Sequence, residues 1–590
     1  MAVTTSYPGI YIQELPSPSH SVTAAPTSVT VFVGYCHPFQ TPQGNLKTPI
    51  EIFSFGDYQA NFGGFFELNP WLPDYLGNAV FQFFENGGND AWVVGLPTSG
   101  FVDANGDPVD ANGNPNPGGP EITLSAATIT FDMSPAASPG TVNVTLSAKQ
   151  LGGLTGNAAD PTSGTVTQVQ FVNRKQSDPA VQDFDISDIV ITWGSTGETY
   201  RGIAAKDIAT TLAQSALVAM TPLAANETPA SFPDTSARPD KGKLTYATVP
   251  PPNSTLLNIA DYAHVFDSGQ PLDVDVKIFN LMVLPGISPV TPQQINLLSE
   301  ALAYCEQKRA FFIMDAPPIA TTSAVGPAPA GLGLPLLPAD VPPRVMMDQF
   351  WNGLALNQAN PPTDMAPPPV SPNGAIYFPY LQTVDQITLQ PMISPPSGYV
   401  AGIYAQEDAA VSVGKAPAGL ETTLLGTTGV VPWGRMTDMQ QGVLNKNDGV
   451  NCLREFPGLG PPVVWGARTL VASNPAFQQW RYVPVRRTAL FLEQSLYQSL
   501  GWVVFQPNDT PLWNAITQEI EAFMLSLFRQ GSYFQGSTPA DAFLVRCDST
   551  TTTPTDQQNG VVNILVGFAP LKPAEFVVLQ ITQLAGQTQT

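Results

Sequence analysis

Residues 79–95 read AVFQFFENGGNDAWVVG and contain the end of a helix, its cap and a buried strand. Apolar residues recur at helical spacing over 72–86, namely at Leu72, Leu76, Ala79, Val80, Phe83 and Phe84. Asn86-Gly87-Gly88 follows and is typical of a helix C-cap. The stretch VTVFVGYC at 29–36 is rich in β-branched residues and predicts a second buried strand. The order strand, helix, strand predicts an α/β layer.

The α/β pattern stops near residue 100 and resumes after residue 245. Between these points, alternating apolar residues predict an all-β module with one helix near 204–219. Its predicted strands lie at 122–124, 127–131, 142–146, 166–171 and 189–193. We therefore interpret residues 100–245 as an insertion, and insertions of this kind usually lie on an accessible surface.

Beyond the insertion, the sequence predicts a strand at 278–284, a helix at 292–308 and a strand at 310–315. Residues 482–505 predict a strand, a helix and a further strand that ends with Trp502–Phe505.

The clearest helix of the chain follows, with Thr510 as the expected N-cap and Pro511 at the first helical position. Its apolar residues form one continuous face made of Trp513, Ile516, Ile520, Phe523, Met524 and Leu527. Gly531 ends it, and strands are expected at 542–546 and 561–567.

Isolated strand patterns occur at both ends of the chain. Tyr7-Pro8-Gly9 is a turn signal, and the short strand at 10–15 follows it. The other strand covers residues 576–581. Because no partner strand lies near residues 10–15 in sequence, this strand is expected to pair with a distant segment or with another chain. The strand at 576–581, like the first, lies at a chain terminus.

Charge excludes two classes of partner. The 590 residues carry a formal net charge of −23, which argues against nucleic acid and against anionic membranes as the main partner. Only 12% of the residues are charged, well below the usual share. Two explanations of the low share of charged residues fit equally well. Surface is buried against copies of the chain, or the exposed surface is rich in Ser, Thr, Gln, Asn and Pro.

Metal, disulfide and membrane signals are missing. The four cysteines, Cys36, Cys305, Cys452 and Cys547, are far apart and predict buried free thiols; neither they nor the three histidines show zinc spacing. We expect no cofactor, since no GxxxxGK[ST] loop occurs. No basic residue precedes Lys47, and no apolar run reaches the roughly 20 residues of a membrane span, so we expect cytoplasmic synthesis and no direct membrane insertion.

A series of motifs resembles contractile tail sheath proteins, in the order of that family. The N-terminal ones are YPGIYIQELPS (7–17), PTSVTVFVG (26–34), FGG (62–64) and AVFQFFENGGNDAWVV (79–94). The C-terminal ones are PSGYVAGIYAQED (396–408), KAPAG (415–419), LNKNDGVNCLREFPGLGPPVVWGARTL (444–470), WRYVPVRRTALFLEQSL (480–496), GWVVFQPND with LW (501–513), AFLVRCD (542–548) and GFAPLKPAEFVVLQITQ (567–583). The resemblance covers roughly 1–95 and 275–583.

The resemblance implies a multidomain α/β and α+β fold with a subtilisin-like α/β middle domain and a small α+β C-terminal domain beside an inner tube. We divide the chain into an N-terminal arm (1–28), an α/β sheath domain in two parts (29–99 and 246–466), an inserted β-rich outer domain (100–245), a C-terminal inner domain (467–575) and a C-terminal arm (576–590).

The function implied is mechanical: a non-enzymatic subunit that polymerises helically around an inner tube and contracts to drive it through a target envelope. The implied partners are further copies in stacked rings, the tube protein, and baseplate and terminal cap proteins. Assembly is expected in the bacterial cytoplasm, as part of a phage tail or a tail-like particle that is released or membrane-anchored.

Three groups of residues are candidates for assembly contacts. The strand arms that the resemblance places in sheets of neighbouring subunits contain Tyr7, Ile10, Tyr11, Ile12, Phe576, Val577, Val578, Leu579 and Ile581. The helix expected at the tube carries Gln518, Glu519 and Glu521 on its polar side, which is equally explained as a solvated face. The basic group of Arg454, Arg468, Arg481, Arg486 and Arg487 either contacts acidic surfaces of adjacent subunits or pairs locally.

Two other function classes are weighed. A subtilisin-like domain raises the question of a protease, but His, Asp and Ser cluster only at His264, Asp267 and Ser268, and a triad normally gathers distant segments. No GxSxG elbow occurs. The other alternative is a non-contractile surface or adhesive particle protein that uses the insertion for binding.

Overall fold

The computed structural model divides into two compact units. Unit 1 contains Met1–Pro26, Val411–Lys415 and Arg487–Thr590, and unit 2 contains Thr27–Ala410 and Ala416–Arg486. Within these, the structure describes residues 21–37, 40–66, 74–96, 101–102, 108–109, 128–135, 138–149, 154–155, 167–174, 185–193, 196–224, 227–233, 256–257, 259–289, 292–316, 371–387, 389, 391–431, 434–531 and 533–576.

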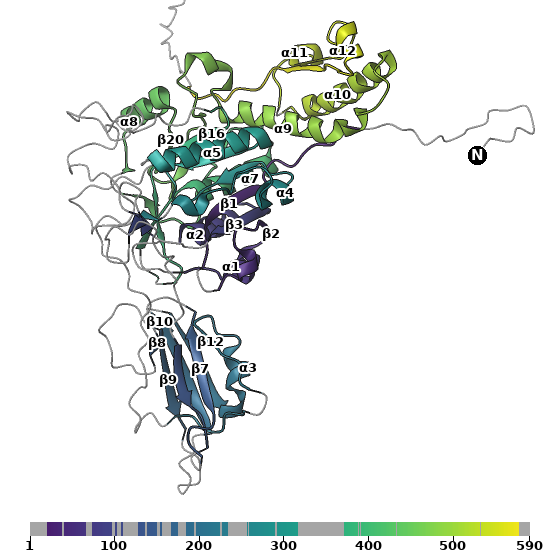
Figure 1. Ribbon diagram of the computed structural model, residues 1–590. Helices are drawn as coiled ribbons and strands as arrows, with labels where there is room; N and C mark the ends of the chain where they lie inside the picture. The colour runs from purple at the N-terminus through teal and green to yellow at the C-terminus, as the bar shows by residue number, and fades with distance from the viewer. Residues whose placement is uncertain are drawn as a thin grey trace, which may run out of the picture. The chain divides into compact units, whose positions relative to one another are not determined.

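Unit 2 is built on an eight-stranded sheet with the order β2-β3-β1-β14-β15-β16-β20-β21 (Figure 1). Its strands are β1 (Thr30–Tyr35), β2 (Ile50–Ile52), β3 (Ala91–Leu96), β14 (Leu281–Val283), β15 (Phe311–Asp315), β16 (Gly374–Phe378), β20 (Asn451–Arg454) and β21 (Val463–Trp465). The pairs from β3 to β20 are parallel, whereas β2 and β21 join the two edges antiparallel. The predicted α/β layer is confirmed.

Helices cover both faces of this sheet, as parallel strands require. On one face lie α2 (Tyr75–Glu85) and α7 (Ser397–Ala410); Phe83 of α2 packs on Phe32 of β1. On the other face, α5 (Pro292–Lys308) shares a core with the inward side chains of the strands. Helix α2 starts where Asp74 caps it by accepting a hydrogen bond from the Gly77 amide at 2.7 Å.

Helices α2 and α7 approach each other closely because α7 has glycines at the contact. A Cβ added at Gly398 would lie 2.5 Å from Ala79 Cα, and one added at Gly402 would lie 2.8 Å from the Phe83 carbonyl oxygen.

We expect Gly398→Ala to lower the free energy of unfolding by about 1–3 kcal/mol through overpacking. Chemical denaturation measures this. Gly442→Ala is the matched control, because nothing described lies within 4 Å of that Cβ; equal effects of both variants would contradict the prediction.

A buried carboxylate joins three segments at the carboxyl end of β15. Asp315 accepts hydrogen bonds from the Gly286 amide at 2.9 Å, the Ser397 amide at 2.8 Å and the Ser397 hydroxyl at 2.7 Å. Burial raises the pKa of Asp315 to about 7, although these donors act in the opposite direction. The start of α7 is thereby fixed to the end of the central strands.

The described part of the predicted insertion contains two small sheets whose residues share one core with Ile387. Its first two strands, β4 (Phe101–Val102) and β5 (Pro108–Val109), instead form a sheet with β13 (Leu256–Leu257) beyond the insertion. One has β6 (Thr128–Asp132), β7 (Asn143–Ala148) and β12 (Val218–Met220); the other has β8 (Leu154–Thr155), β9 (Thr167–Asn173), β10 (Ile186–Trp193) and β11 (Thr196–Ala204). Four of the predicted strands are confirmed, and the one at 122–124 lies outside the described residues. The predicted helix is shorter, because only α3 (Ile208–Leu212) forms.

Unit 1 contains most of α9 (Val483–Ser499), then η8 (Leu500–Val503), α10 (Thr510–Gln530), α11 (Pro539–Ala542), β22 (Phe543–Arg546), α12 (Pro554–Gln558) and β23 (Leu565–Phe568).

The predicted strand ending in Trp502–Phe505 is wrong: η8 is a 3-10 helix and Phe505 has φ +68°. The N-cap of α10 is Asp509 and not Thr510, because the Asp509 carboxylate accepts from the Leu512 amide. Both predicted C-terminal strands form, although β23 starts later than expected.

The remaining described elements include the strands of two further three-stranded sheets, β13-β4-β5 and β18-β17-β19. They are η1 (Gln43–Asn45), α1 (Phe55–Phe62), β4 (Phe101–Val102), β5 (Pro108–Val109), η2 (Ala205–Asp207), β13 (Leu256–Leu257), η3 (Ile259–Tyr262), α4 (Pro271–Asp275), β17 (Leu381–Val384), β18 (Pro391–Ser394), β19 (Gly429–Val430), α8 (Asp438–Val443), η6 (Leu444–Asp448) and η7 (Pro475–Trp480). All four cysteines are buried free thiols, as predicted.

Candidate assembly interface

The last part of the predicted N-terminal arm (1–28) is fixed on α9. The Thr23 amide donates to the Ser499 hydroxyl at 3.0 Å, and the Ala25 amide donates to the Ser495 hydroxyl at 2.9 Å. Val22 packs against the core of unit 1. Sequence analysis missed these two serines, because their partners are 476 and 470 residues away and no local pattern marks them.

The segment that leads to the C-terminal arm is fixed in the same unit. The Gln535 amide donates to the Ala569 carbonyl at 2.9 Å, and the Leu571 amide donates to the Tyr533 carbonyl at 3.3 Å. Between them, Phe534 forms an antiparallel bridge with Pro570. Unit 1 therefore holds the root of each arm, which is residues 22–25 for the N-terminal arm and residues 569–571 for the C-terminal arm.

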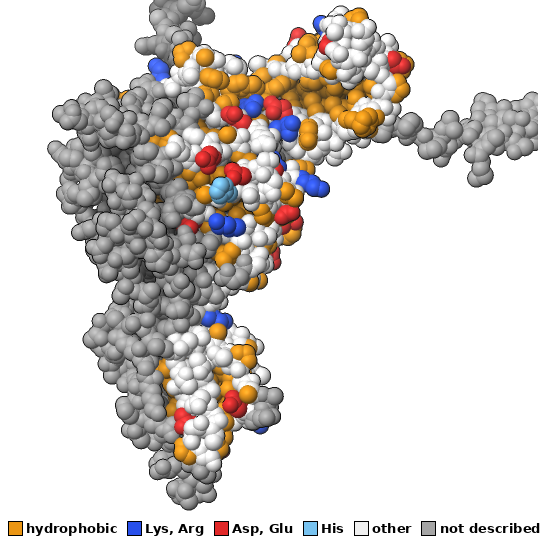
Figure 2. Space-filling view, viewed as in Figure 1, with side chains coloured by type: hydrophobic (Ala, Val, Ile, Leu, Met, Phe, Trp, Pro, Cys, Tyr) orange, Lys and Arg blue, Asp and Glu red, His pale blue; other side chains and the backbone are white. Residues whose placement is uncertain are grey.

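The sheet formed by β22 and β23 of unit 1 is small. Strands β22 and β23 pair antiparallel and, within the described residues, form a sheet of two strands. Val545 and Val566 face the core, whereas Leu544 and Leu565 on the outer face are exposed. Figure 2 shows hydrophobic side chains gathered over the part of the molecule that carries this unit. A sheet of two strands is marginally stable alone, and an open strand edge is a template for a further strand.

The predicted arm residues lie mostly outside the described residues. These are Tyr7, Ile10, Tyr11, Ile12, Val577, Val578, Leu579 and Ile581. Phe576 is described, has no strand assignment and exposes most of its side chain. The pairing of the arms with other subunits stays a prediction.

Helix α10 has the predicted apolar face. Trp513, Ile516, Ile520, Phe523, Met524 and Leu527 are all buried. On the polar side, Gln518 and Glu521 are exposed. Glu519 is half-buried and accepts a hydrogen bond from Trp502 Nε1 at 3.1 Å, so this carboxylate also fixes η8 to the helix. The contact of this face with a tube stays a prediction.

The predicted basic group makes contacts within the chain. Arg468 is buried and donates to the Asn445 carbonyl at 3.2 Å, and Arg487 is buried as well. Arg486 Nε donates to Asn373 Oδ1 at 2.8 Å. Arg481 donates to Gln478. These contacts favour the local interpretation over an exposed patch, and an inter-subunit role of the group stays a prediction.

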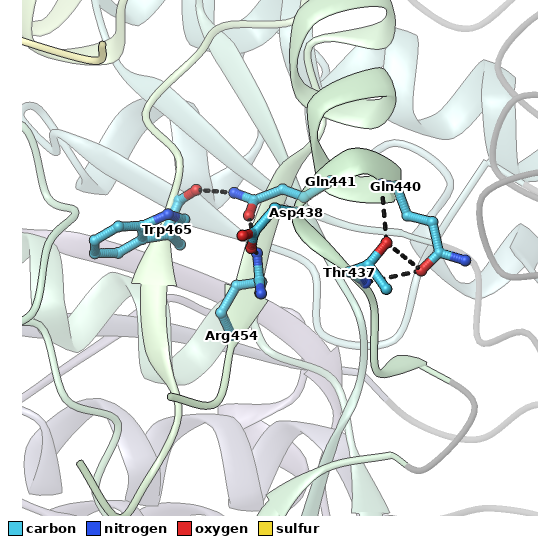
Figure 3. A network of polar contacts seen from close by, with 6 residues as sticks. All are labelled: Thr437, Asp438, Gln440, Gln441, Arg454 and Trp465. Atoms are coloured by element: carbon cyan, nitrogen blue, oxygen red, sulfur yellow. Dashed lines mark hydrogen bonds and ion pairs between the residues drawn. The ribbon is translucent and has the colours of Figure 1, made fainter. Parts of the chain in front are cut away.

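Arg454 belongs to a polar network that fastens α8 to two strands (Figure 3). Its guanidinium lies 2.8 Å from Asp438 Oδ1 and donates to Gln441, which in turn donates to the Trp465 carbonyl at 2.8 Å. Thr437 and Gln440 form a capping box at the start of the same helix. Nη1 of Arg454 is therefore engaged by two side chains of the same unit.

We expect the double variant Arg486→Glu/Arg487→Glu to unfold at lower temperature, since it places a carboxylate at the buried position of Arg487 and breaks the Asn373 contact. Burial of an unpaired charge costs about 3 kcal/mol or more. Thermal unfolding measures the change, with exposed Lys277→Glu as the matched control. A double variant that melts like the wild type but fails to assemble would instead support an inter-subunit contact.

The residues of the considered protease triad do not assemble into one. His264 Nδ1 lies 2.5 Å from Asp267 Oδ2, and both side chains are exposed. The Ser268 hydroxyl lies 3.4 Å from Asp273 Oδ2, so it is directed at a carboxylate and not at the imidazole. A nucleophilic serine needs its base within hydrogen-bond distance.

The described residues contain no group of three or more His, Cys, Asp or Glu side chains placed to hold a metal ion. Among their helices, none combines the length and the apolar character that crossing a bilayer requires.

Comparisons with known proteins agree with the resemblance read from the motifs. Residues 476–583 match the family model of the phage tail sheath C-terminal domain, which confirms the resemblance for the part of the chain that forms most of unit 1. No curated protein matches the sequence.

Solved structures extend the likeness in fold to nearly the whole chain. The helical sheath of the anti-feeding prophage in its contracted state aligns over 98% of this chain and 100% of its own, with 20% identity and a TM-score of 0.51. The baseplate structure of the same particle contains a chain that aligns equally well, with a TM-score of 0.51 and 20% identity over 98% of this chain and 99% of that one. The contracted sheath of an extracellular contractile injection system, PVC, aligns over 99% of each chain with 20% identity and a TM-score of 0.50.

Proposed function

We propose that this chain is the structural subunit of a contractile sheath. The observation that carries the proposal is that one compact unit matches the sheath C-terminal domain family and also holds the roots of both terminal arms. The folds of a helical sheath in its contracted state and of a baseplate-associated chain align with nearly the whole chain. Self-assembly into a helical polymer and association with a baseplate follow.

The arms connect subunits in this proposal. The strand sequences at 10–15 and 576–581 add to strand edges of the C-terminal sheets of neighbouring subunits, next to β22 and β23. Main-chain pairing tolerates large rigid-body motion because it does not depend on side-chain detail. One ring that rotates and compacts would therefore pull the next ring through strands that remain paired.

The energy for contraction comes from new contacts between subunit bodies and requires no nucleotide. The inner tube and a terminal cap are further partners, and α10 is the candidate element at the tube. The three-layer unit 2 serves as a subtilisin-like body without enzymatic activity, and the inserted β module lies on the outside of the particle. Synthesis and assembly take place in the bacterial cytoplasm, as part of a phage tail or tail-like particle.

Negative-stain electron microscopy of the chain co-expressed with its tube and baseplate proteins tests the proposal. We expect long striated tubes or short, wide hollow cylinders. Monodisperse monomers in the presence of the tube would refute it and would favour the surface or adhesive protein.

A further inference from the structure

A pocket of about 350 Å³ lies in the inserted β module, where α3 lies beside β12 (Figure 1). Three alanines leave the space: Ala209 and Ala213 are one helical turn apart, and Ala219 belongs to β12. Met220 and Leu223, which pack against the core of the two small sheets, also line the pocket. Pockets that bind small molecules have volumes of about 300–1,000 Å³ and mostly apolar walls. This pocket therefore has the size and the character of a site for a small ligand.

A single lysine supplies the charge of the pocket. Lys149 is the one charged side chain among the described residues that line it. It is half-buried, and its Nζ donates to the Ser215 carbonyl oxygen at 2.6 Å. Its backbone is fixed on both sides, because the amide donates to the Leu217 carbonyl at 2.8 Å and the carbonyl accepts from Gln40 Nε2 at 3.2 Å. The ammonium group is therefore held in place before any ligand binds, which lowers the entropic cost of binding.

Within the described residues, only one donor of the Lys149 ammonium group is used. The group has three N–H donors, and the Ser215 carbonyl accepts from one of them. No carboxylate in the described part of the chain forms an ion pair with it. The Glu198 carboxylate raises the pKa of Lys149, against the larger effect of burial, but accepts its own hydrogen bonds from the Ser215 hydroxyl at 2.6 Å and the Ala216 amide at 2.7 Å. A half-buried cation in this position is the complement of an anionic group.

The walls of the pocket determine what kind of anion fits. Apart from Lys149, the described lining side chains are apolar, and the sulfur of Met220 is their only, weak, acceptor. A sugar or a nucleotide would leave several buried polar groups unpaired, at about 1–3 kcal/mol each. An alkyl chain has no such groups, and since a water-sized group occupies about 30 Å³, a chain of about eight to ten carbon atoms fits. The protein's net charge of −23 opposes such an anion only weakly, because salt screens charges beyond about 8 Å.

We propose that this pocket is a binding site for a free medium-chain carboxylate, whose head group contacts Lys149 Nζ and whose alkyl chain lies along Ala209, Ala213 and Met220. Charge-assisted hydrogen bonds are about twice as strong as neutral ones, so Lys149 selects the ionised head group over an alcohol of the same length. The site adds ligand binding to the proposed mechanical role and does not depend on that role.

Isothermal titration calorimetry of the full chain at pH 7 tests the site, with sodium octanoate below its micelle concentration and with octanol as the neutral ligand. We expect saturable binding of octanoate and at least about tenfold weaker binding of octanol. Lys149→Met keeps an apolar stem and removes the charge, so it should lose at least about tenfold in octanoate affinity and keep its octanol affinity. Lys206→Met is the matched control, because Lys206 is an exposed lysine of the same module outside the pocket.

Ala213→Leu tests the cavity independently of Lys149, and it remains informative if Lys149→Met fails to fold. The longer side chain fills the pocket from an exposed position, so binding of both ligands should be lost while the protein melts at the wild-type temperature. Octanoate binding that Ala213→Leu leaves unchanged would overturn the site. Equal affinities for octanoate and octanol would overturn recognition by Lys149.

The remaining outcomes concern other occupants of the pocket. Binding to vesicles of anionic phospholipid in place of free octanoate would overturn the assignment to a free ligand. Self-association of the wild type that Ala213→Leu abolishes would assign the pocket to a second copy of the chain. A wild type that forms sheaths but does not bind octanoate would overturn the ligand site alone, whereas octanoate binding without sheath assembly would refute only the sheath function.

Discussion

Val578→Pro is expected to abolish assembly and to leave the monomer folded. Residues 576–581 are proposed to add as a strand to a neighbouring subunit, and proline removes a ladder donor and restricts the backbone in the middle of that strand. Since each subunit is linked through its arms, the defect is repeated at every position of the helix. Sedimentation and electron microscopy of the co-expressed proteins measure the polymerised fraction.

Two controls separate strand pairing from other effects of this change. Val578→Thr keeps the backbone donor and a β-branched side chain, so it should assemble. Removal of residues 586–590 deletes only the polar tail beyond the strand and should also be tolerated. Assembly of the proline variant at the wild-type level would contradict the role of the C-terminal arm.

The free energy of unfolding is expected to decrease as pH rises from about 4 to about 7. The pKa of Asp315 is raised from its ordinary 3.8 to about 7 by burial, so the folded chain keeps a proton that the unfolded chain has lost. The stabilisation by this proton is complete below 3.8, the pKa of Asp315 in the unfolded chain, and is lost as pH rises through about 7, its pKa in the folded chain. Over this window the loss amounts to about 4 kcal/mol. Asp74 acts in the same direction, because burial raises its pKa to about 8.

Asp315→Asn should reduce the slope of the free energy of unfolding against pH by up to about 1.4 kcal/mol per pH unit. It should also destabilise the fold at pH 5 by about 1–3 kcal/mol, because the new amide group adds donors among the three donors that face this position. Chemical denaturation at pH 5, 6 and 7 measures both effects. Exposed Asp548 is the control: hydrogen bonds from Thr550 lower its pKa, so Asp548→Asn should leave the slope in this range unchanged. An unchanged slope for Asp315→Asn would contradict the prediction.

The assembly residues were predictable only where they belong to a regular local pattern. The apolar face of α10 followed from its spacing, and so its polar side was identified as well. The basic group was placed by sequence density alone, yet Arg468 and Arg487 are buried. Sequence density does not reveal burial, because burial depends on segments that are distant in sequence. The sequence pattern places Phe505 in a strand, because apolar residues in succession resemble one and nothing local signals its positive φ.

The sequence by itself determined the elements with a clear period, among them β1, α2, β3, α5 and α10, and it determined an acidic chain whose motifs resemble sheath proteins. Side-chain periodicity and capping are local, so they are legible without the fold. Only the tertiary structure decided the order of the central sheet, the burial of Asp315 and the attachment of residues 23–25 to α9. Each of these joins segments far apart in the chain, and their free energy depends on three-dimensional packing that no local pattern encodes.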